Sequence, residues 1–291
     1  MTNQDNQEAV QLKESPTLKR KAEQMELDNR IEKAMASIPH KIAVISGKGG
    51  VGKTTVAANV AIRLANAGFK TGCLDVDITG PNLHKLLGVQ ANPVVDPDTR
   101  QIIPVDGPLG IKVMSMAFLL DSDYTPVIWR GPMKMGIIRE FLGNVRWSGV
   151  DYLVIDLPPG TGDEVLDIMQ LVKPLDGIVL VSTSQVMSLI SVAKTATMAQ
   201  KMDVKILGIV ENMSTFTCEQ CQHAVHLFGE PDGVERLARQ FNIPFLGSIP
   251  MEPARMQQPG SIAPPAEQVT PASKVLDAIH VVLLKQLGTT K

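Results

Sequence analysis

Residues 47–54 read Gly-Lys-Gly-Gly-Val-Gly-Lys-Thr, so half of these eight positions are glycine. The spacing matches the pattern G-x-x-x-x-G-K-[ST], in which backbone N–H groups cradle phosphate oxygens. Lys53 would pair with the β- and γ-phosphates, and the Thr54 hydroxyl would ligate Mg²⁺. The predicted strand and helix on either side favour this interpretation over a chance Gly-rich turn. We therefore expect ATP with Mg²⁺ to contact Gly47, Gly49, Gly50, Val51, Gly52, Lys53, Thr54 and Thr55.

Lys48 is a second lysine inside this loop, at a position where ordinary phosphate-binding loops accept any residue. Among its small neighbours it resembles the lysine of the deviant Walker A loop, which reaches across a dimer interface to the partner's nucleotide. That resemblance implies a catalytic charge supplied in trans, where the transition state of phosphoryl transfer becomes negative. The alternative is a solvated lysine beside the phosphates.

Three aspartates close apolar runs that we predict to be strands. Asp75 lies at the end of the run 71–76, Asp77 follows that run, and Asp156 ends the run 151–156. Ligands of open α/β sheets bind at the carboxyl ends of strands. We predict that Asp156 holds Mg²⁺ mostly through water and that Asp77 positions the attacking water. Asp75 would contact the ligands of the metal rather than the metal itself. Any one acid alone would more often be a helix cap or a solvated turn residue.

Cys218 and Cys221 form a Cys-x-x-Cys pair after the sixth predicted strand. Two thiolates can share a metal centre, but tetrahedral and cubane sites need four ligands. A second copy of the chain could donate its own pair, so that a [4Fe–4S] cluster or Zn²⁺ bridges a dimer. His223 and His226 could instead complete a zinc site within one chain, and a redox dithiol is the third possibility. We interpret Cys73 as a core residue.

These groups need a scaffold, and short apolar runs alternate with helical stretches from about residue 41 onward. The predicted strands are 41–46, 71–76, 111–116, 151–156, 177–183, 205–210 and 243–247. The predicted helices are 53–67, 133–143, 163–171, 187–201, 232–241 and 272–287. This alternation is typical of a doubly wound, mostly parallel α/β sheet flanked by helices. We predict one ATPase domain over 37–291, with excursions at 89–108 and 212–231.

Residues 1–36 differ in composition from the rest of the chain. Residues 1–20 are rich in Gln, Asn, Glu and Lys, which predicts a flexible tail. Residues 21–36 place Met25, Ile31 and Met35 among charged residues, which predicts a short amphipathic helix.

The overall composition narrows the classes of partner. Lys plus Arg is 28 and Asp plus Glu is 30, for a net charge of −2. This balance gives no global electrostatic reason to bind nucleic acid or an anionic membrane. The sequence contains no apolar run of about 18 residues and no secretory signal. Three cysteines are too few for a disulfide framework. We therefore expect a cytoplasmic protein that binds neither nucleic acid nor membrane.

Several segments together resemble the Mrp/ApbC group of P-loop ATPases, over about residues 38–290. In chain order these segments are GKGGVGKT, DVDITGPN, WRGPM, DLPPGTGD, ENMS, the cysteine pair and Ile249-Pro250. The resemblance implies a P-loop NTPase of the deviant Walker A class that works as a homodimer. Members bind an iron–sulfur cluster and pass it to apo-proteins, so a [4Fe–4S] cluster would bridge the dimer through Cys218 and Cys221.

The same resemblance implies roles for individual residues. Lys48 would be the lysine that acts in trans, while Asp77 and Asp156 would belong to the two switch segments. Asn212 would read the adenine edge, and the loop near Pro250 would lie beside the ring.

Two other classes of function share parts of this pattern. A positioning ATPase of the MinD/ParA type has the same loop but uses an amphipathic C-terminal helix for membranes or a basic surface for DNA. The predicted helix 272–287 is apolar with few cations, so we expect it to pack on the core. A metal chaperone bridged by Zn²⁺ is the other alternative, because four cysteines suit zinc and iron–sulfur centres equally.

Overall fold

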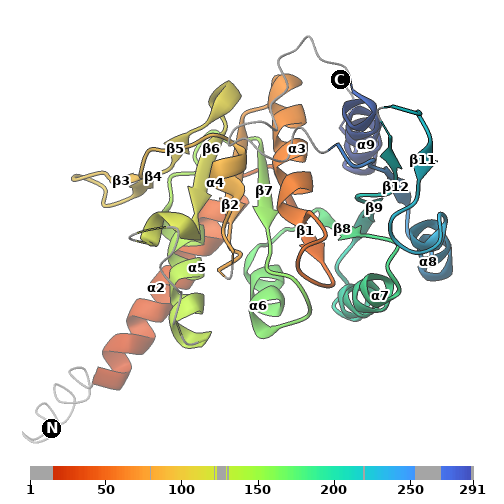
Figure 1. The fold of residues 1–291 in the computed structure, drawn as a ribbon. Coiled ribbons are helices and arrows are strands. Elements are labelled where there is room, and N and C mark those ends of the chain that lie inside the picture. Colours follow the sequence, from red (N-terminus) through yellow and green to blue (C-terminus); the bar gives the residue numbers. More distant parts are fainter. Residues whose placement is uncertain are drawn as a thin grey trace, which may run out of the picture.

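The computed structural model describes residues 16–78, 80–120, 122, 129, 131–218, 220–252 and 270–289. Its main sheet has eight strands in the order β12-β9-β8-β1-β7-β2-β6-β5 (Figure 1). All neighbouring pairs are parallel except β5 with β6. The predicted doubly wound, mostly parallel α/β fold is confirmed. Thr79, Arg130 and Glu219, which belong to the segments quoted above, lie outside the described residues.

The strands of the main sheet follow the apolar runs of the sequence closely. Their bounds are β1 His40–Ser46, β2 Thr71–Asp75, β5 Val105–Asp106, β6 Lys112–Ser115, β7 Tyr152–Asp156, β8 Gly177–Ser182, β9 Ile206–Glu211 and β12 Phe245–Ser248. Every residue of β2, β7 and β8 is buried. Strands covered by helices on both faces have no solvent side, and this explains why they are almost continuously apolar.

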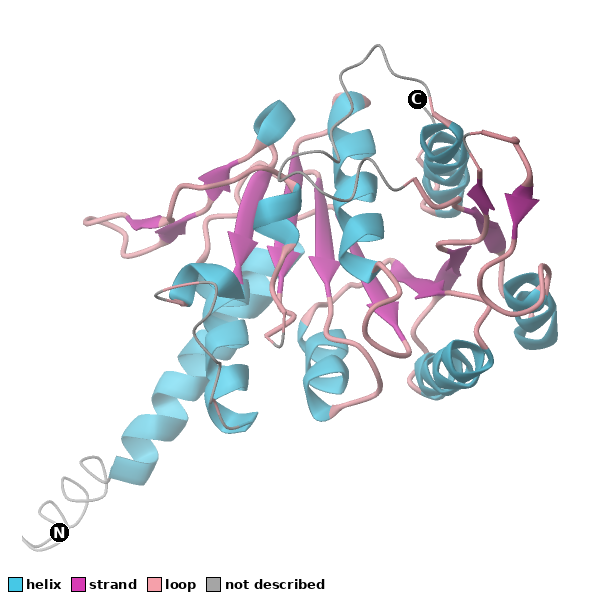
Figure 2. Cartoon of the chain, in the orientation of Figure 1, coloured by secondary structure: helices cyan, strands magenta, loops and turns pink. Residues whose placement is uncertain are grey.

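Helices cover both faces of this sheet (Figure 2). One buried core includes side chains of α3 Lys53–Asn66, α4 Leu83–Leu86 and α9 Pro271–Gln286. The other includes side chains of α2 Pro16–Ala36, α5 Gly131–Asn144, α6 Asp163–Leu171, α7 Val186–Lys201 and α8 Gly233–Phe241. The apolar positions of α9, namely Leu276, Ile279 and Leu283, are buried in the first core. The prediction that the last helix packs on the core is therefore confirmed.

The two predicted excursions contain short elements that the sequence pattern did not reveal. In the first, β3 Val94–Val95 pairs antiparallel with β4 Ile102–Ile103, and the antiparallel edge strand β5 follows. In the second, β10 Phe216–Thr217 pairs antiparallel with β11 Ala224–Val225. Strands of two residues are too short to show an alternating pattern, so neither pairing could be predicted. Short 3₁₀ helices at Pro108–Gly110 and Met116–Leu119 flank β6.

The N-terminal helix is longer than predicted. It begins at Pro16, within the segment assigned to a flexible tail, and its 21 residues run to Ala36. Residues 1–15 lie outside the described part of the chain. The helix packs against α5, where a Cβ on Gly143 would come within 3.0 Å of the Ile31 side chain. Proline is favoured in the first turn of a helix. The prediction of the helix start did not use this signal at Pro16.

A buried lysine joins this helix to the sheet. The Lys41 side chain in β1 is fully buried, and its Nζ donates hydrogen bonds to the carbonyl oxygens of Met35 and Ile38. These carbonyls lie at or just beyond the end of α2, where helical donors run out, and the Met35 carbonyl also accepts the Ile38 N–H at 3.3 Å. Burial lowers the pKa of Lys41, against the opposing effect of Asp176.

Replacing Lys41 by methionine should therefore destabilise the protein. The variant keeps the apolar stem but removes the lysine donor from both carbonyls, and the Met35 carbonyl keeps only its longer bond from the Ile38 N–H. This loss should lower the free energy of unfolding by about 2 kcal/mol. Urea denaturation measures this loss. Lys33→Met, an exposed change in the same helix, is the matched control and should stay within about 0.5 kcal/mol of wild type. Equal losses in the two variants would contradict a capping role for Lys41.

Candidate functional site

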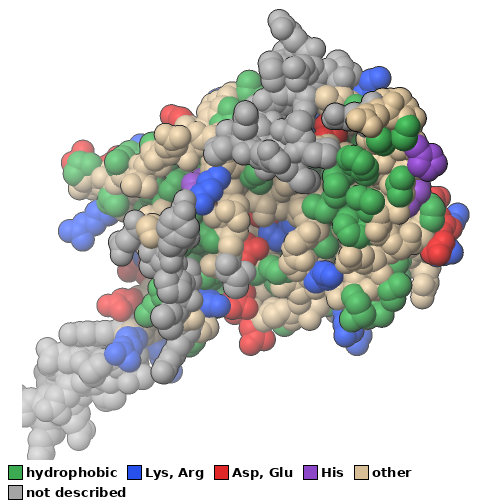
Figure 3. All heavy atoms as spheres, viewed as in Figure 1, with side chains coloured by type: hydrophobic (Ala, Val, Ile, Leu, Met, Phe, Trp, Pro, Cys, Tyr) green, Lys and Arg blue, Asp and Glu red, His purple; other side chains and the backbone are tan. Residues whose placement is uncertain are grey.

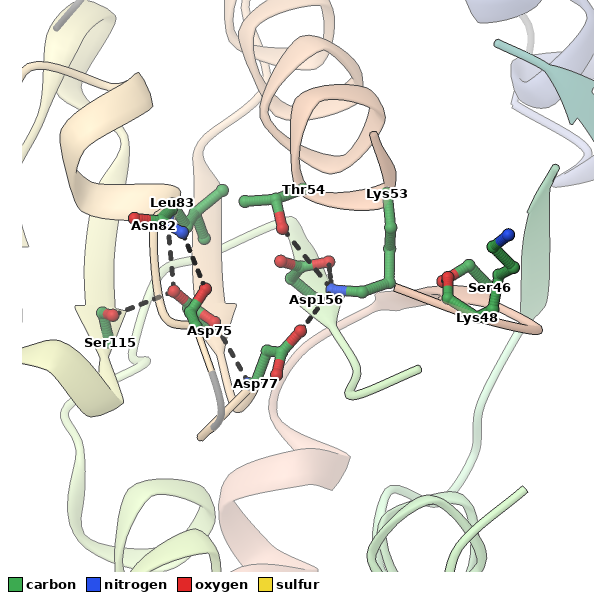
Figure 4. A network of polar contacts seen from close by, with 11 residues as sticks. Ser46, Lys48, Lys53, Thr54, Asp75, Asp77, Asn82, Leu83, Ser115 and Asp156 are labelled. Carbon is green, nitrogen blue, oxygen red and sulfur yellow. Dashed lines mark hydrogen bonds and ion pairs between the residues drawn. The ribbon is translucent and has the colours of Figure 1, made fainter. Parts of the chain in front are cut away.

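The predicted nucleotide residues meet at the carboxyl edge of the sheet. Strand β7 lies between β1 and β2, so Asp156 at its end stands level with Asp75 on β2. Lys53, the first residue of α3, reaches into the gap between them. Its Nζ lies 2.6 Å from Asp156 Oδ1 and 3.3 Å from Asp77 Oδ2 (Figure 4). The Thr54 hydroxyl is 3.5 Å from the same ammonium group.

Glycines shape the loop for two separate physical reasons. Gly50 and Gly52 adopt φ angles of 80° and 82°, a left-handed conformation that other residues rarely take. Gly47 instead packs against α7, where an added Cβ would come within 2.3 Å of the backbone of Ser191 and Val192. The loop thus lies between the start of α3 and α7 and packs against the α7 backbone. Gly49 meets nothing within 4 Å, so close packing does not demand glycine there.

Asp75 organises the loop that carries Asp77. Its two carboxylate oxygens accept hydrogen bonds from the backbone N–H of Asp77 at 3.1 Å and of Leu83 at 3.2 Å. The Ser115 hydroxyl on β6 donates a third, at 3.0 Å. Asp75 therefore fixes the backbone of the loop that carries Asp77. Its predicted support of the metal stays a prediction.

The site holds more negative than positive charge. Burial alone would lower the pKa of Lys53, but the Asp156 and Asp77 carboxylates outweigh it and raise this pKa above its ordinary value. Burial raises the pKa of Asp156, against the opposing effect of Lys53. The second oxygen of Asp156 is buried and accepts no hydrogen bond from the described residues. A buried carboxylate oxygen beside a hydroxyl in an acidic site is a donor set that suits Mg²⁺.

The acidic site should make stability depend on pH. Burial, and next the Asp156 carboxylate, raise the pKa of Asp75 from 3.8 to about 8. Between these values the unfolded chain has released a proton that the folded chain still holds. Asp75 therefore stabilises the fold most at low pH, and its contribution is lost as pH rises through about 8.

As pH rises from about 5 to about 8, the titration of Asp75 should lower the free energy of unfolding of the nucleotide-free protein. The loss should be up to about 1.4 kcal/mol per pH unit. Urea titrations across that range should show a shallower slope for Asp75→Asn than for wild type. A steeper or unchanged slope in the variant would contradict the shifted pKa.

Lys48 lies at the outer side of the loop and points away from the Lys53 cluster (Figure 4). Its Nζ donates a hydrogen bond to Gln185 Oε1 at 3.2 Å, and its backbone carbonyl accepts one from the Ser46 hydroxyl at 2.9 Å. Gln185 is the residue that immediately precedes α7. The structure thus separates the two lysines of the loop, with Lys53 in the acidic site and Lys48 toward α7.

Asn212 contacts the phosphate loop from the far side. This buried residue follows β9, and its Nδ2 donates a hydrogen bond to the Val51 carbonyl at 2.9 Å. A Cβ on Gly52 would come within 2.1 Å of the same nitrogen, so the loop and the amide are closely packed. Half-buried Pro250 follows Ile249, whose carbonyl accepts the N–H of Ser214. The adenine contacts of Asn212 and Pro250 remain predictions.

The cysteine pair lies apart from this cluster, on the connection between β10 and β11. Cys218 is half-buried and Cys221 is exposed. The turn is closed by hydrogen bonds from the Cys218 N–H to the His223 carbonyl and from the Gln222 N–H to the Cys218 carbonyl. In the part of the chain that the structure describes, no three His, Cys, Asp or Glu residues are grouped to hold a metal. The described residues therefore do not form the single-chain zinc site that His223 and His226 could have completed.

Cys73 behaves as predicted for a core residue. It is fully buried in β2, and burial raises the pKa of its thiol. It is therefore unsuited to act as a thiolate ligand at neutral pH.

Three contributors to the site were missed by the sequence analysis. Ser115 binds Asp75, Gln185 binds Lys48, and the α7 backbone at Ser191 packs on Gly47. Ser115 is the next-to-last residue of the predicted strand 111–116 and the last residue of β6, so its place at a strand end is a usable signal. The neighbours of that strand in the sheet, however, cannot be read from sequence.

A family model described as the ParA-type NUBPL iron-transfer P-loop NTPase matches residues 37–283. The chain belongs to this family. A protein from Methanocaldococcus jannaschii, named iron-sulfur cluster carrier protein, is 47% identical over 226 residues, covering 77% of each chain. A Drosophila pseudoobscura protein, named cytosolic Fe-S cluster assembly factor Nubp2 homolog, is 41% identical over 85% of this chain and 98% of its own length.

Solved structures support the same placement of this NUBPL-family chain. A nucleotide-binding protein from Archaeoglobus fulgidus, solved with ADP, is 40% identical, with a TM-score of 0.67 over 88% of this chain and 92% of the other. The cell division ATPase MinD of Pyrococcus furiosus shares the fold, with a TM-score of 0.59 and 23% identity over 85% of this chain and 99% of its own. The fold is thus that of nucleotide-binding P-loop NTPases. No helix among the described residues is long and apolar enough to cross a membrane.

Proposed function

We propose that this protein is a homodimeric ATPase that carries a [4Fe–4S] cluster and transfers it to apo-proteins. The observation that carries the proposal is the pairing of two sites in one chain. One is an acidic phosphate-binding site around Lys53, and the other is a two-thiol turn without a third grouped ligand among the described residues. Membership of an iron-transfer family supports the cluster as the cargo.

In the nucleotide site, the chain supplies binding, charge and positioning. The loop 47–54 would hold the phosphates by its N–H groups, and Lys53 would exchange part of its contact with Asp77 and Asp156 for the β- and γ-phosphates. Mg²⁺, held by Thr54 and Asp156, would neutralise charge on the phosphates. Asp77 would orient a water near the γ-phosphate, and its carboxylate 3.3 Å from the Lys53 ammonium supports this role. Hydrolysis would also need the Lys48 of a second copy.

In the cargo site, each chain provides half of the ligands. Cys218 and Cys221 are both at least partly accessible at the end of a short hairpin, so four thiolates from two copies can meet on a two-fold axis. A cluster held at an accessible seam between two chains can be released when the chains separate. This suits a carrier better than a cluster buried inside one chain.

A single segment connects the two sites. Asn212 binds the phosphate loop at Val51, and the hairpin with the cysteines begins four residues later at Phe216. The intervening backbone is fixed to the segment after β12 by bonds from Ser214 to Ile249 and from Met251 to Thr215. We infer that a change in the loop on nucleotide binding reaches the cysteines along this path.

Transfer from the reconstituted protein to an apo-ferredoxin tests the proposal. The gain of the acceptor's absorption and activity measures the rate, with and without ATP and Mg²⁺. We expect transfer that changes severalfold with nucleotide in wild type, and no nucleotide effect in Lys53→Ala. Failure to deliver any cluster would contradict the carrier function. Delivery at equal rates under all conditions would contradict only the coupling to ATP.

A further inference from the structure

Glu211 is a buried acid that the proposed chemistry of the nucleotide site does not use. It is the last residue of β9 and is 2% exposed. One of its carboxylate oxygens accepts a hydrogen bond from the Ser184 hydroxyl, and the other accepts one from the Ser248 hydroxyl. Among the described residues, no lysine, arginine or histidine forms an ion pair with this carboxylate. Two serine hydroxyls, rather than a cation, therefore hold the Glu211 side chain.

The burial of this carboxylate costs free energy that a neutral side chain would not cost. A charge taken out of water is poorly stabilised unless a cation or a full set of hydrogen bonds replaces the lost hydration. Hydrogen bonds to a carboxylate, however, are about twice as strong as those between neutral groups. Glu211 is therefore better suited to hold the two serines in fixed places than to add to the stability of the fold.

Both partners of the Glu211–Ser184 hydrogen bond are next in sequence to residues that bind the phosphate loop. Asn212 follows Glu211, and its side chain donates a hydrogen bond to the loop backbone at 2.9 Å. Gln185 follows Ser184, and its side chain accepts a hydrogen bond from Lys48 at 3.2 Å. A movement of the phosphate loop on nucleotide binding therefore reaches this bond from both of its ends.

Ser184 also contacts the segment that follows the cysteine turn. A Cβ on Gly229 would come within 1.9 Å of the Ser184 carbonyl oxygen, and a Cβ on Gly233 within 3.4 Å of its hydroxyl oxygen. Gly229 has a left-handed φ of 63°, so both conformation and space demand glycine there. The turn itself is open to solvent, because residues 221–227 are all exposed, and Figure 3 shows histidine side chains at the surface over β11. The chain thus passes within a few residues from an exposed turn to a close contact with a buried serine.

Ser248 makes an equivalent contact to the same carboxylate but belongs to a different part of the fold. It ends β12, an edge strand of the main sheet, and is paired with Glu211 in the parallel register of β12 and β9. The N–H of the next residue, Ile249, donates a hydrogen bond to the Glu211 carbonyl at 2.7 Å. Backbone bonds therefore keep β12 in place without the Ser248 hydroxyl, whereas the Ser184 hydroxyl is a side-chain link between β9 and the segment that leads into α7.

We propose that Glu211 is a positioning residue that links the phosphate loop to the cysteine turn through Ser184. When nucleotide moves the loop, the Glu211–Ser184 bond passes this movement to the backbone at Gly229, and the exposure of the thiols changes. This connection enters the cysteine turn from its C-terminal side, whereas the segment from Asn212 enters it from the N-terminal side. The inference rests on the proposed function, because it specifies how the nucleotide site acts on the thiols.

Ser184→Ala and Ser248→Ala test the proposal as a matched pair. Each variant removes one hydroxyl from the same carboxylate and leaves the other in place. Glu211→Ala would remove both contacts at once, so a loss of folding would imitate the predicted effect. Glu211→Gln instead keeps the size of the side chain and replaces the bond to Ser184 by a weaker, neutral one.

The measurement is the rate at which a maleimide alkylates Cys221, followed by peptide mass spectrometry. The cluster-free protein is treated with and without a non-hydrolysable ATP analogue and Mg²⁺, and the ratio of the two rates reports the effect of nucleotide on the turn. Thermal unfolding and titration with the same analogue are recorded on the same samples. They show whether a variant is folded and whether its phosphate loop still binds.

We expect the alkylation rate of Cys221 in wild type to change at least about fivefold with nucleotide. Ser248→Ala should match this ratio, Ser184→Ala should show no nucleotide effect, and Glu211→Gln should lie between the two. Both serine variants should bind the analogue within a few fold of wild type and unfold at similar temperatures, so a merely structural role would not separate them.

A wild-type ratio in Ser184→Ala or Glu211→Gln, or equal losses in the two serine variants, would overturn the positioning role and leave the proposed function standing. Equal rates with and without nucleotide in wild type would overturn the positioning role together with the coupling to ATP. A wild type that takes up or delivers no cluster would overturn the carrier function, and the alkylation ratios would still decide the role of Glu211.

Discussion

Lys53→Ala should weaken ATP binding at least about 100-fold, whereas Lys48→Ala should leave the affinity within a few fold of wild type. Lys53 is buried between Asp156 and Asp77, and none of the other described residues of this cluster carries a positive charge. Lys48 instead points toward α7 and does not reach the acidic site of its own chain. Isothermal titration with ATP and Mg²⁺ separates the two effects.

Hydrolysis should fail in both variants for different reasons. Lys53→Ala fails to bind, while Lys48→Ala binds but lacks the charge that the partner's lysine supplies, which should cost about 10³-fold in kcat. Lys53→Ala should also unfold more easily, by about 3 kcal/mol, because the buried Asp156 carboxyl group loses its counterion. The stability of Lys48→Ala is the control and should be near that of wild type.

Mixing the two variants gives a sharp test of action in trans. In a hybrid dimer the Lys48→Ala chain still binds ATP, and its partner still carries Lys48. The mixture should therefore recover part of the wild-type ATPase rate, although each variant alone is inactive. No recovery in a mixture that demonstrably forms hybrid dimers would mean that Lys48 acts within its own chain or not at all.

Loss of either thiol of the Cys218/Cys221 pair should abolish stable cluster binding. Each single serine variant removes two of the four ligands of a two-fold site, since the change appears in both chains. We expect iron after reconstitution and desalting to fall at least about tenfold in each. Cys73→Ala is the control, because Cys73 is buried in β2 and should affect stability but not iron content.

A histidine double variant distinguishes a bridging site from one within a chain. His223 and His226 could serve one chain if they moved, so His223→Ala with His226→Ala should keep its iron if the bridge is correct. Full iron retention in Cys218→Ser would contradict a role for the pair in the cargo site.

The sequence predicted the sheet well because its central strands are buried on both faces. The middle residues of β1, β7 and β8 are apolar, and the glycine spacing of the loop permits few other interpretations. It also predicted that Asp75, Asp77 and Asp156 end strands. These features are local, so the pattern of neighbouring residues in the sequence is enough to predict them.

What could not be predicted depends on which strands become neighbours. Asp75 and Ser115 come together only because β6 lies next to β2, and the Lys48–Gln185 contact spans 137 residues. The beginning of α2 was also placed wrongly. Its first half is too polar to show a helical face, although Pro16 is a local signal for its beginning. The Lys41 cap at its other end comes from β1. Such contacts depend on tertiary structure that no local pattern contains.

Native mass spectrometry of the anaerobically reconstituted protein tests the central claim most directly. The account predicts a brown protein with a broad absorption band near about 400 nm, whose dominant species is two chains with about four irons and four sulfides. Single chains should carry neither iron nor sulfide. A colourless protein that retains zinc, or a cluster bound to a single chain, would contradict a bridging iron–sulfur carrier.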